Sequence, residues 1–313
     1  MEDNNDLIEK IVNNLEKVII GKKKEIYNVM KGILANGHVL IEDVPGVGKT
    51  TLVKTLAKSF SLTFNRIQFT PDVLPSDITG ISIYNQKNME FEFRKGPIFA
   101  NLILADEINR TSPKSQSALL EVMEEKQVSE GGNTYKLDLP FFVIATQNPI
   151  EHEGTYILPE AQLDRFMIRV KLGYPKKEDE VNILEIYRNQ EPLDNLESVA
   201  TASELLDLQK KVRQVYSSKE MNEYIVEIVN ATRINKRLLL GASPRAALAL
   251  LRVAQANAVI NKRDYIIPED VKENAALVLA HRVTLSSFEK ANENTSDEII
   301  EDIINNLKVP RVR

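Results

Sequence analysis

The 313-residue sequence predicts an α/β fold with a parallel sheet, followed by a helical domain. Short apolar runs alternate with helical patterns over residues 38–172, which is typical of parallel strands joined by helices. Strand signals stop after about residue 175, and helical periodicity continues to the end of the chain. We therefore expect an α/β domain over residues 1–174 and a helical domain over residues 175–313.

The elements follow from periodicity and from helix-capping residues. The expected strands are the apolar runs at residues 38–42, 65–69, 101–105, 141–146 and 167–172. Helices are expected at residues 7–19, 25–35 and 49–60, and another begins at Pro113 with Ser112 as its N-cap. Two inserted hairpins are expected, within residues 71–98 and 128–137. In the second half, helices are expected at residues 177–189, 203–216, 220–237, 244–260, 268–282 and 297–307, with a linker at 190–200.

Composition excludes several classes of protein. The chain contains no Cys and only three His, so disulfide, thiolate and His-rich metal chemistry are not expected. Its formal net charge of −5 gives no general attraction to nucleic acid. The apolar runs are too short to span a membrane, and the acidic start does not resemble a secretory signal. We therefore expect a soluble, cytoplasmic protein without membrane insertion.

A glycine-rich loop follows the strand at residues 38–42 and leads into a helix. Gly46 and Gly48 allow backbone N–H groups to approach a phosphate, and the helix N-terminus adds partial positive charge. Lys49 would reach the β- and γ-phosphates, and the Thr50 hydroxyl would hold Mg²⁺. The pattern's first Gly is replaced by Asp43, and the competing interpretation is a strand–helix turn without a ligand. The residues expected to bind nucleotide in this segment are Pro45, Gly46, Val47, Gly48, Lys49, Thr50 and Thr51.

Polar side chains stand at the ends of three predicted strands, where α/β sheets bind ligands. Asp106 and Glu107 end the third strand; alternation along a strand would point them to opposite faces, so we expect Asp106 to hold Mg²⁺ and Glu107 to act as general base. Asn148 follows the fourth strand and could sense the γ-phosphate or orient the water, although Asn before Pro also starts turns. Gln68 ends the second strand and could hold Glu107 inactive until a substrate arrives.

Two arginines are candidates for phosphate contacts. Arg245 follows an N-cap and an N1 proline in a first helical turn, where the helix dipole disfavours a cation unless an anion lies nearby. Its alternative is a surface Arg paired to an acid. Arg165 could pair locally with Asp164 or Glu160, or it could reach the nucleotide of a neighbouring subunit.

Together these segments resemble the P-loop NTPases of the AAA+ class, and more closely the MoxR family within it. The strings that carry the resemblance lie at residues 36–50, 67–72, 74–80, 104–110, 145–149, 158–166 and 241–245. The resemblance implies a five-stranded parallel sheet of order 5-1-4-3-2, a C-terminal helical lid, and a ring, commonly hexameric, with ATP bound between subunits. In that family an Asp commonly replaces the first Gly of the loop.

The resemblance also implies roles for individual residues. Lys49 and Thr50 match Walker A, Asp106 and Glu107 match Walker B, and Asn148 matches sensor one. Arg165 matches the trans arginine finger, and Arg245 matches the lid arginine of sensor two. Ile20 and Gly21 would form part of the adenine pocket. The two hairpins match inserts that face the pore and the substrate in that family.

The function expected from this resemblance is that of an ATP-hydrolysing, Mg²⁺-dependent, chaperone-like motor. It would remodel or activate a partner protein, with metal insertion or complex maturation as tasks and a von Willebrand factor A domain protein as the partner class. Two alternatives stand beside it: a nucleic-acid-remodelling motor, and a nucleotide-binding assembly switch without hydrolysis. The inserts lack clustered Lys and Arg, which argues against nucleic acid as partner.

Overall fold

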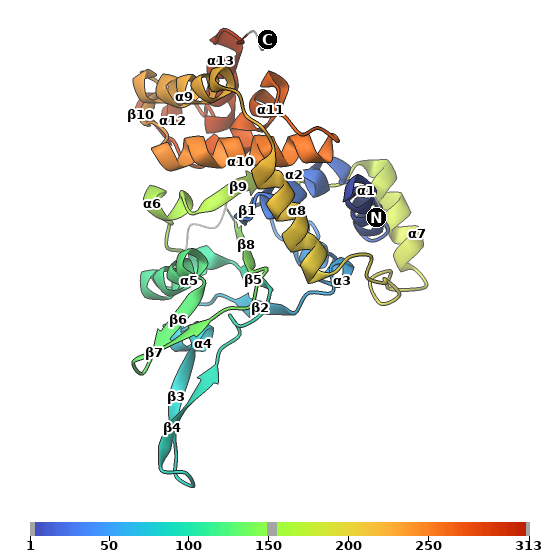
Figure 1. Cartoon of the computed structure of the whole chain (residues 1–313), viewed down its shortest axis with the longest axis vertical. Coiled ribbons are helices and arrows are strands. Elements are labelled where there is room, and N and C mark those ends of the chain that lie inside the picture. The colour runs from blue at the N-terminus through green and yellow to red at the C-terminus, as the bar shows by residue number, and fades with distance from the viewer. Residues whose placement is uncertain (1–3, 149–154, 311–313) are drawn as a thin grey trace.

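A parallel sheet of five strands forms the centre of the first half of the chain (Figure 1). The structure is a computed structural model that describes residues 4–148 and 155–310. The strands are β1 (His38–Glu42), β2 (Phe64–Gln68), β5 (Leu102–Asp106), β8 (Phe142–Gln147) and β9 (Phe166–Val170). Their spatial order is β2-β5-β8-β1-β9, and every neighbouring pair is parallel. The predicted sheet and its strand order are confirmed, and all carboxyl ends meet at one edge.

Helices cover both faces of the sheet because its strands are apolar on both sides. Val39 and Ile41 of β1 pack in a core with the helices α1 (Asn4–Glu16), α2 (Lys23–Leu34) and α3 (Lys49–Ser59). Leu40, between them, packs on the opposite face with Leu119 and Leu120 of α5 (Pro113–Glu125). The side chain of Ser112 accepts a hydrogen bond from the N–H of Ser115, which confirms the predicted N-cap of α5. Three short elements complete this half: α4 (Pro75–Thr79), the 3-10 helix η1 (Ile108–Arg110) and α6 (Glu160–Leu163).

Two antiparallel hairpins project from the sheet, as expected from the sequence (Figure 1). The longer pairs β3 (Gly80–Asn85) with β4 (Glu90–Lys95), and the shorter pairs β6 (Gln127–Glu130) with β7 (Asn133–Lys136). The Phe93 ring of the longer hairpin stacks on the Tyr135 ring of the shorter one, with 4.2 Å between centroids. The inserts therefore contact each other through an aromatic pair, while Met89 and Phe91 near the tip are exposed.

Helices make up most of the second half. They are α7 (Lys177–Tyr187), α8 (Ala202–Gln214), α9 (Lys219–Ile234), α10 (Pro244–Ile260), α11 (Pro268–Leu279), α12 (Ser287–Ala291) and α13 (Ser296–Asn306). The expectation that strands are absent here was wrong at one place: β10 (Leu238–Leu240) pairs antiparallel with β11 (Thr284–Leu285). The three leucines of β10 form an apolar run too short for a periodicity signal, and they fall between the helices expected at residues 220–237 and 244–260.

The two halves share one continuous apolar core. Buried residues of α1, α2 and α3 belong to the same cluster as buried residues of α8, α9, α10, α11 and α13. Figure 1 shows α10 lying across the molecule above β9. The domain boundary near residue 174 stays a prediction. Among the described residues, no helix is both long enough and apolar enough to cross a membrane.

Candidate active site

The loop after β1 has the conformation that a phosphate-binding loop requires. Gly46 and Gly48 have φ angles of 86° and 85°, in the left-handed region that side chains with a Cβ disfavour. Gly48 is the N-cap of α3, and no side chain caps this helix end. The N–H groups of the first turn of α3 therefore point into the loop, where they can bind an anion. Thr50 and Thr51 lie half-buried in that first turn, and Pro45 and Val47 lie in the loop itself.

Asp43 and Lys49 form hydrogen bonds that stabilise the loop. The Lys49 ammonium donates to the Asp43 carbonyl oxygen at 2.9 Å. The Asp43 carboxylate accepts from the N–H of Val44 at 2.9 Å and from the N–H of Gly173 at 2.6 Å. The residue that replaces the first Gly of the pattern thus ties the loop to the turn that follows β9, a contact that the sequence reading missed.

Ile20 and Gly21 lie beside the same turn. The Lys22 ammonium donates to the carbonyl oxygens of Leu172 and Tyr174 at 2.6 and 2.8 Å. A Cβ on Gly21 would lie 2.2 Å from the Asp179 carboxyl carbon, so α7 approaches this backbone closely. Because Asp43 links the phosphate loop to this turn, the segment predicted to contact adenine and the loop predicted to contact phosphate are connected.

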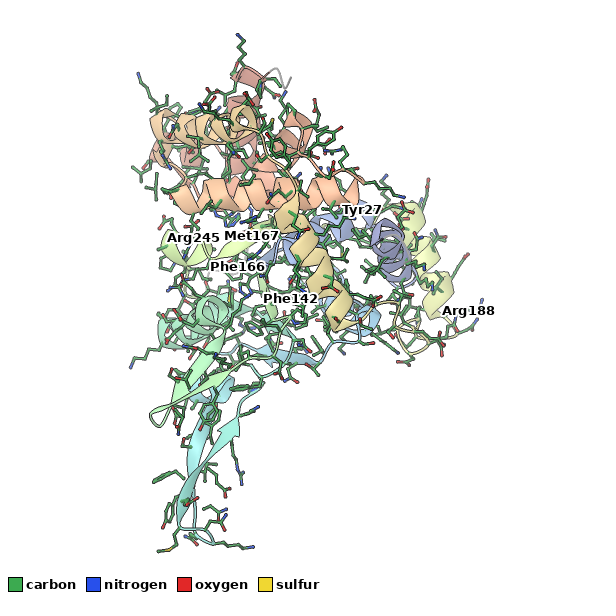
Figure 2. All side chains as sticks on the ribbon, in the orientation of Figure 1. Tyr27, Phe142, Phe166, Met167, Arg188 and Arg245 are labelled. Atoms are coloured by element: carbon green, nitrogen blue, oxygen red, sulfur yellow. The ribbon has the colours of Figure 1, made fainter. Side chains whose placement is uncertain are left out.

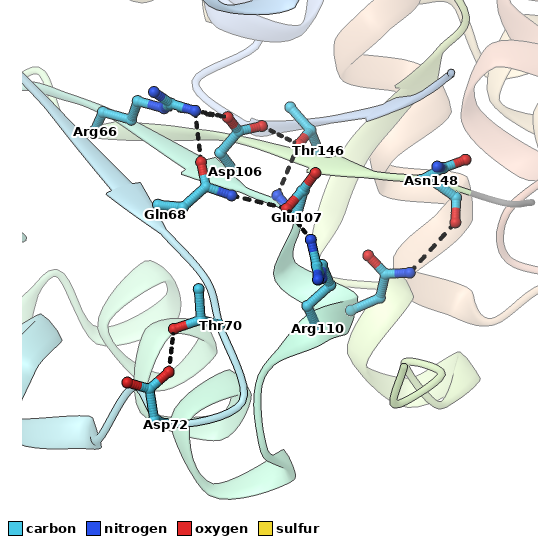
Figure 3. Close-up of polar contacts among 10 residues, drawn as sticks. Arg66, Gln68, Thr70, Asp72, Asp106, Glu107, Arg110, Thr146 and Asn148 are labelled. Atoms are coloured by element: carbon cyan, nitrogen blue, oxygen red, sulfur yellow. Dashed lines mark hydrogen bonds and ion pairs between the residues drawn. The ribbon is translucent and has the colours of Figure 1, made fainter. Parts of the chain in front are cut away.

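Asp106 ends β5 at the carboxyl edge of the sheet (Figure 3). One carboxylate oxygen accepts from the Thr146 hydroxyl at 2.6 Å, and the other accepts from the Arg66 guanidinium at 2.7 Å. Glu107 has a φ angle of 59°, so the chain turns sharply after Asp106. Glu107 therefore lies outside β5, and strand alternation, the sequence-based reason for separate roles of the two acids, does not apply to it.

Glu107 is held by two donors. Its Oε2 accepts from Gln68 Nε2 at 2.8 Å and from Arg110 Nη1 at 3.1 Å. Gln68 in turn accepts from Arg66, the same arginine that pairs with Asp106. A network of Arg66 and Gln68 therefore joins the two acids, as the dashed contacts in Figure 3 show. The predicted approach of Gln68 to Glu107 is present, and its inhibitory role stays a prediction.

Asn148 follows β8, the strand next to β5, and it is buried. Its carbonyl oxygen accepts from the Asn109 side chain at 3.3 Å, which joins the end of β8 to η1. The structure thus brings Asn148 to the same edge of the sheet as Asp106 and Glu107. Pro149, the second half of the predicted turn, lies outside the described residues.

The oxygen and nitrogen groups at this edge fit a nucleoside triphosphate with a hard divalent cation. The uncapped start of α3 and the Lys49 ammonium suit phosphate oxygens. The Thr50 hydroxyl and the Asp106 carboxylate supply the oxygen ligands that Mg²⁺ prefers. Asp106 ends one strand and Glu107 follows it directly, and the loop follows another strand two positions away in the sheet.

Arg165 and Arg245 lie at the opposite edge. Both pair with Glu124 at the end of α5, at 3.3 and 2.5 Å respectively. Glu124 follows Met123, whose carbonyl oxygen is 3.0 Å from the ring of His38 at the amino end of β1. The phosphate loop leaves the carboxyl end of β1, and a five-residue strand is roughly 16 Å long. The structure therefore does not bring Arg245 to the phosphate loop of its own chain, and its predicted contact with a phosphate stays a prediction.

The local partners considered for Arg165 were wrong. Asp164 pairs with Arg282, and Glu160 accepts from the Thr284 hydroxyl. Arg245 and Met167 line one cavity, and both are labelled between the lid helices and the sheet in Figure 2. Sequence reasoning missed Glu124, Arg66 and Arg282, since only the fold brings each to its partners.

Comparison with known proteins shows which family the chain is similar to. Residues 38–168 match the ATPase family associated with various cellular activities (AAA), and residues 230–303 match the AAA lid domain. The chain is 50% identical over 309 residues to the uncharacterized protein YeaC of Bacillus subtilis (strain 168), covering 99% of this chain and 97% of YeaC. It is 42% identical over 314 residues to Chaperone MoxR1 of Mycobacterium tuberculosis, covering 97% and 83%. A crystal structure of a candidate ATPase from Cytophaga hutchinsonii matches with a TM-score of 0.91 and 44% identity, covering 98% and 96%.

The sheet, the lid, the phosphate loop and the acidic strand end define an AAA+ ATPase. Within this class, the chain belongs to the MoxR family.

Proposed function

We propose that the protein binds and hydrolyses ATP with Mg²⁺ at sites that two copies share in a ring, most simply a hexamer. The observation that carries this proposal is the position of Arg165 and Arg245. Both side chains lie at the edge of the sheet opposite to their own phosphate loop, and both pair with Glu124. The guanidinium groups that stabilise charge on a transferred phosphoryl group would therefore come from the adjacent copy.

The remaining roles belong to the carboxyl edge of the sheet. Lys49 and the N-terminus of α3 would bind the phosphates, and Thr50 and Asp106 would hold Mg²⁺. Bound Mg²⁺ would neutralise phosphate charge. Glu107 would accept a proton from the attacking water, and Asn148 would orient that water. Arg110 and Gln68, both within hydrogen-bond distance of Glu107, fix the position of its carboxylate.

We further propose that hydrolysis remodels a client protein in the cytoplasm, with metal insertion or complex maturation as the task. The partner class is a protein with a von Willebrand factor A domain. This proposal is supported by the way that α5 and the aromatic stack connect the acidic strand end to the two hairpins. The helix α5 leads from the acidic strand end to the shorter hairpin, and the Phe93–Tyr135 stack joins that hairpin to the longer one. Met89 and Phe91, 74% and 73% exposed, offer apolar contacts near its tip.

Substitution of Glu107 tests the hydrolytic role. Glu107→Gln keeps the size of the side chain but removes the base, so we expect ATP binding to persist and turnover to fall at least about 100-fold. Calorimetry measures the binding, and phosphate release measures the turnover. Glu301→Gln, an exposed change on α13, serves as control. Unchanged turnover in the Glu107 variant removes the general-base assignment.

Mixing variants tests the sharing of sites. Arg165→Ala protomers keep Glu107, and Glu107→Gln protomers keep Arg165, so mixed interfaces contain one complete site. We expect each variant alone to be inactive and the mixture to regain part of the turnover. A mixture that stays inactive contradicts the assignment of Arg165 to the site of the adjacent copy.

A further inference from the structure

Asp164, the residue before Arg165, is joined to the lid at two points. One carboxylate oxygen accepts from Arg282 Nε at 2.8 Å, and the other accepts from the Ser243 hydroxyl at 3.0 Å. Ser243 is the N-cap of α10, and Arg245 follows two residues later in the first turn of that helix. A single carboxylate therefore belongs to the residue before Arg165 and binds the N-cap residue that lies two positions before Arg245.

Arg282 is buried between the lid and the sheet, with only 2% of its side chain exposed. It also donates to the carbonyl oxygens of Met167, Phe166 and Val278. Burial lowers the pKa of Arg282 to about 10, and the positive charge of Arg245 lowers it as well, whereas Asp164 opposes this shift. A buried ion pair is weak evidence for stability, because removing two charges from water costs about as much as their attraction returns. The Asp164–Arg282 pair is better explained by the neighbouring arginines, Arg165 and Arg245, that it holds in place.

Arg165 and Arg245 emerge from this arrangement into one cavity. The cavity has a volume of about 240 Å³, and its lining includes Asp164, Arg282 and both arginines. Glu124, on its wall, forms ion pairs with both guanidinium groups. The two side chains come from segments about 80 residues apart, so their proximity depends on the junction between the lid and the α6–β9 turn.

We propose that Asp164 and Arg282 are positioning residues that hold Arg165 and Arg245 at a fixed spacing, so that both reach one phosphate chain bound by the adjacent copy. This inference rests on the proposed sharing of sites. Two cations that stabilise one transition state must be held within a fraction of an ångström of the productive geometry, and a misplacement of ~1 Å can cost about 100-fold in rate. Asp164 directly precedes Arg165 and binds Ser243 at the start of the helix that carries Arg245. It therefore sets the spacing of the two arginines without touching the nucleotide.

The test uses protomers with separated tasks. A donor protomer carries Lys49→Ala, so it supplies arginines but binds no nucleotide. An acceptor protomer carries Arg165→Ala and Arg245→Ala, so it binds nucleotide but supplies no arginine. The proposed function predicts turnover in the mixture. Asp164→Asn added to the donor should then reduce this turnover by about 10- to 100-fold. The same change in the acceptor should reduce it by no more than the control below.

Asp270→Asn is the matched control. Asp270 is a buried lid carboxylate paired with Arg263 at 2.6 Å, and its bonds reach neither Arg165 nor Arg245. A role limited to folding predicts equal losses whichever protomer carries Asp164→Asn, and this outcome overturns the proposal. A mixture that is inactive before Asp164 is changed overturns the sharing of sites, and the inference with it.

A second variant covers failure of Asp164→Asn to fold. Ser243→Gly removes the hydroxyl that donates to Asp164 but leaves the Asp164–Arg282 pair, and Gly is nearly as good an N-cap as Ser. In the donor protomer we expect a loss of about 3- to 10-fold, smaller because only the Arg245 segment is released. In the acceptor we expect no loss beyond that of the control. Equal effects in donor and acceptor contradict the positioning role.

Discussion

Arg66 places a cation at the carboxylate that is proposed to hold Mg²⁺. Its guanidinium is 2.7 Å from Asp106, and its side chain is 46% exposed. Since Arg66 and Mg²⁺ attract the same carboxylate, each weakens the hold of the other. We expect Arg66→Gln to lower the Mg²⁺ concentration needed for half-maximal ATP binding by about 2- to 5-fold, which corresponds to an exposed pair. A calorimetric Mg²⁺ titration at fixed ATP measures this.

The matched control is Arg94→Gln, an exposed arginine on β4. It removes the same charge from the protein but lies on the projecting hairpin. A Mg²⁺ requirement that rises in the Arg66 variant, or that moves equally in both, contradicts the competition between the two cations.

At the scale of single residues, the sequence predicts those whose role follows from their immediate neighbours in the chain. Lys49 and Thr50 follow the glycines that shape their loop, and Asp106 follows an apolar strand. Arg66 could not be found this way, because its contact depends on how β2 and β5 are aligned. Gln68 lies directly opposite Asp106 in that register, which brings Arg66 within reach of the acid.

At the scale of elements, α5 carries Glu124, which pairs with Arg165 and Arg245, and it is attached to the sheet. His38 fixes the end of α5 to the sheet: its Nδ1 accepts from the N–H of Val143 at 2.9 Å, and its Nε2 donates to the carbonyl of Met123 at 3.0 Å. A second proton on Nδ1 would face the Val143 N–H group. Burial lowers the pKa of His38 from 6.5 to about 4, and the nearby charge of Lys126 adds to this. His38 is therefore a buried residue whose two ring nitrogens are both hydrogen-bonded.

This pKa predicts a pH dependence of stability. Between about pH 6.5 and 4 the unfolded chain binds a proton at His38 that the folded protein does not, so His38 favours folding fully above pH 6.5 and progressively less as pH falls toward 4. The slope from this residue is at most about 1.4 kcal/mol per pH unit. We expect His38→Gln, which can still accept and donate, to flatten the urea-unfolding free energy over this range. An identical slope in both proteins contradicts the prediction. Burial also lowers the pKa of His281, and this residue makes the same contribution to the pH dependence of stability in both proteins.

The two hairpins should behave as one unit because of the Phe93–Tyr135 stack. An aromatic pair contributes about 0.5–1.5 kcal/mol, so Tyr135→Ala should speed amide hydrogen exchange in β3 and β4 by about 2- to 10-fold. Tyr135→Phe keeps the ring and should leave exchange unchanged. If the alanine variant exchanges like the unmodified protein, the hairpins move independently.

Predicting elements succeeded where a periodic signal was long. The helices at residues 244–260 and 177–189 were placed within two residues of α10 and α7. The pair β10–β11 was missed because a strand of three residues is defined by its partner and not by its own pattern. Gly241 marks the bend that follows β10: a Cβ there would lie 2.6 Å from the Arg233 Cα, so the chain passes directly over the end of α9.

At the scale of the whole molecule, the lid and the sheet are joined by ion pairs as well as by the shared core. Arg169 of β9 lies 3.0 Å from Glu42 of β1 and 2.6 Å from Asp297 of α13. Its side chain is 12% exposed, and that of Glu42 is 16% exposed. The strands β1 and β9 and the helix α13, which are far apart in the sequence, therefore meet at the guanidinium of Arg169. No local sequence pattern around Arg169 indicates these contacts.

Arg169→Met should therefore destabilise the protein as a whole. Removing one partner of a largely buried pair leaves Glu42 without its cation, which costs about 3–5 kcal/mol in a fully buried site, and we expect about 2 kcal/mol here because Asp297 is partly exposed. Urea unfolding followed by far-UV circular dichroism measures this. Lys171→Met is the matched control: Lys171 contacts the same Asp297 at 3.3 Å, but it is 54% exposed, so its loss should cost less than about 0.5 kcal/mol.

Because both halves share one core, the loss of stability in the Arg169 variant should appear as a shift of a single unfolding transition. A separate early transition in the Arg169 variant would show instead that the lid unfolds on its own.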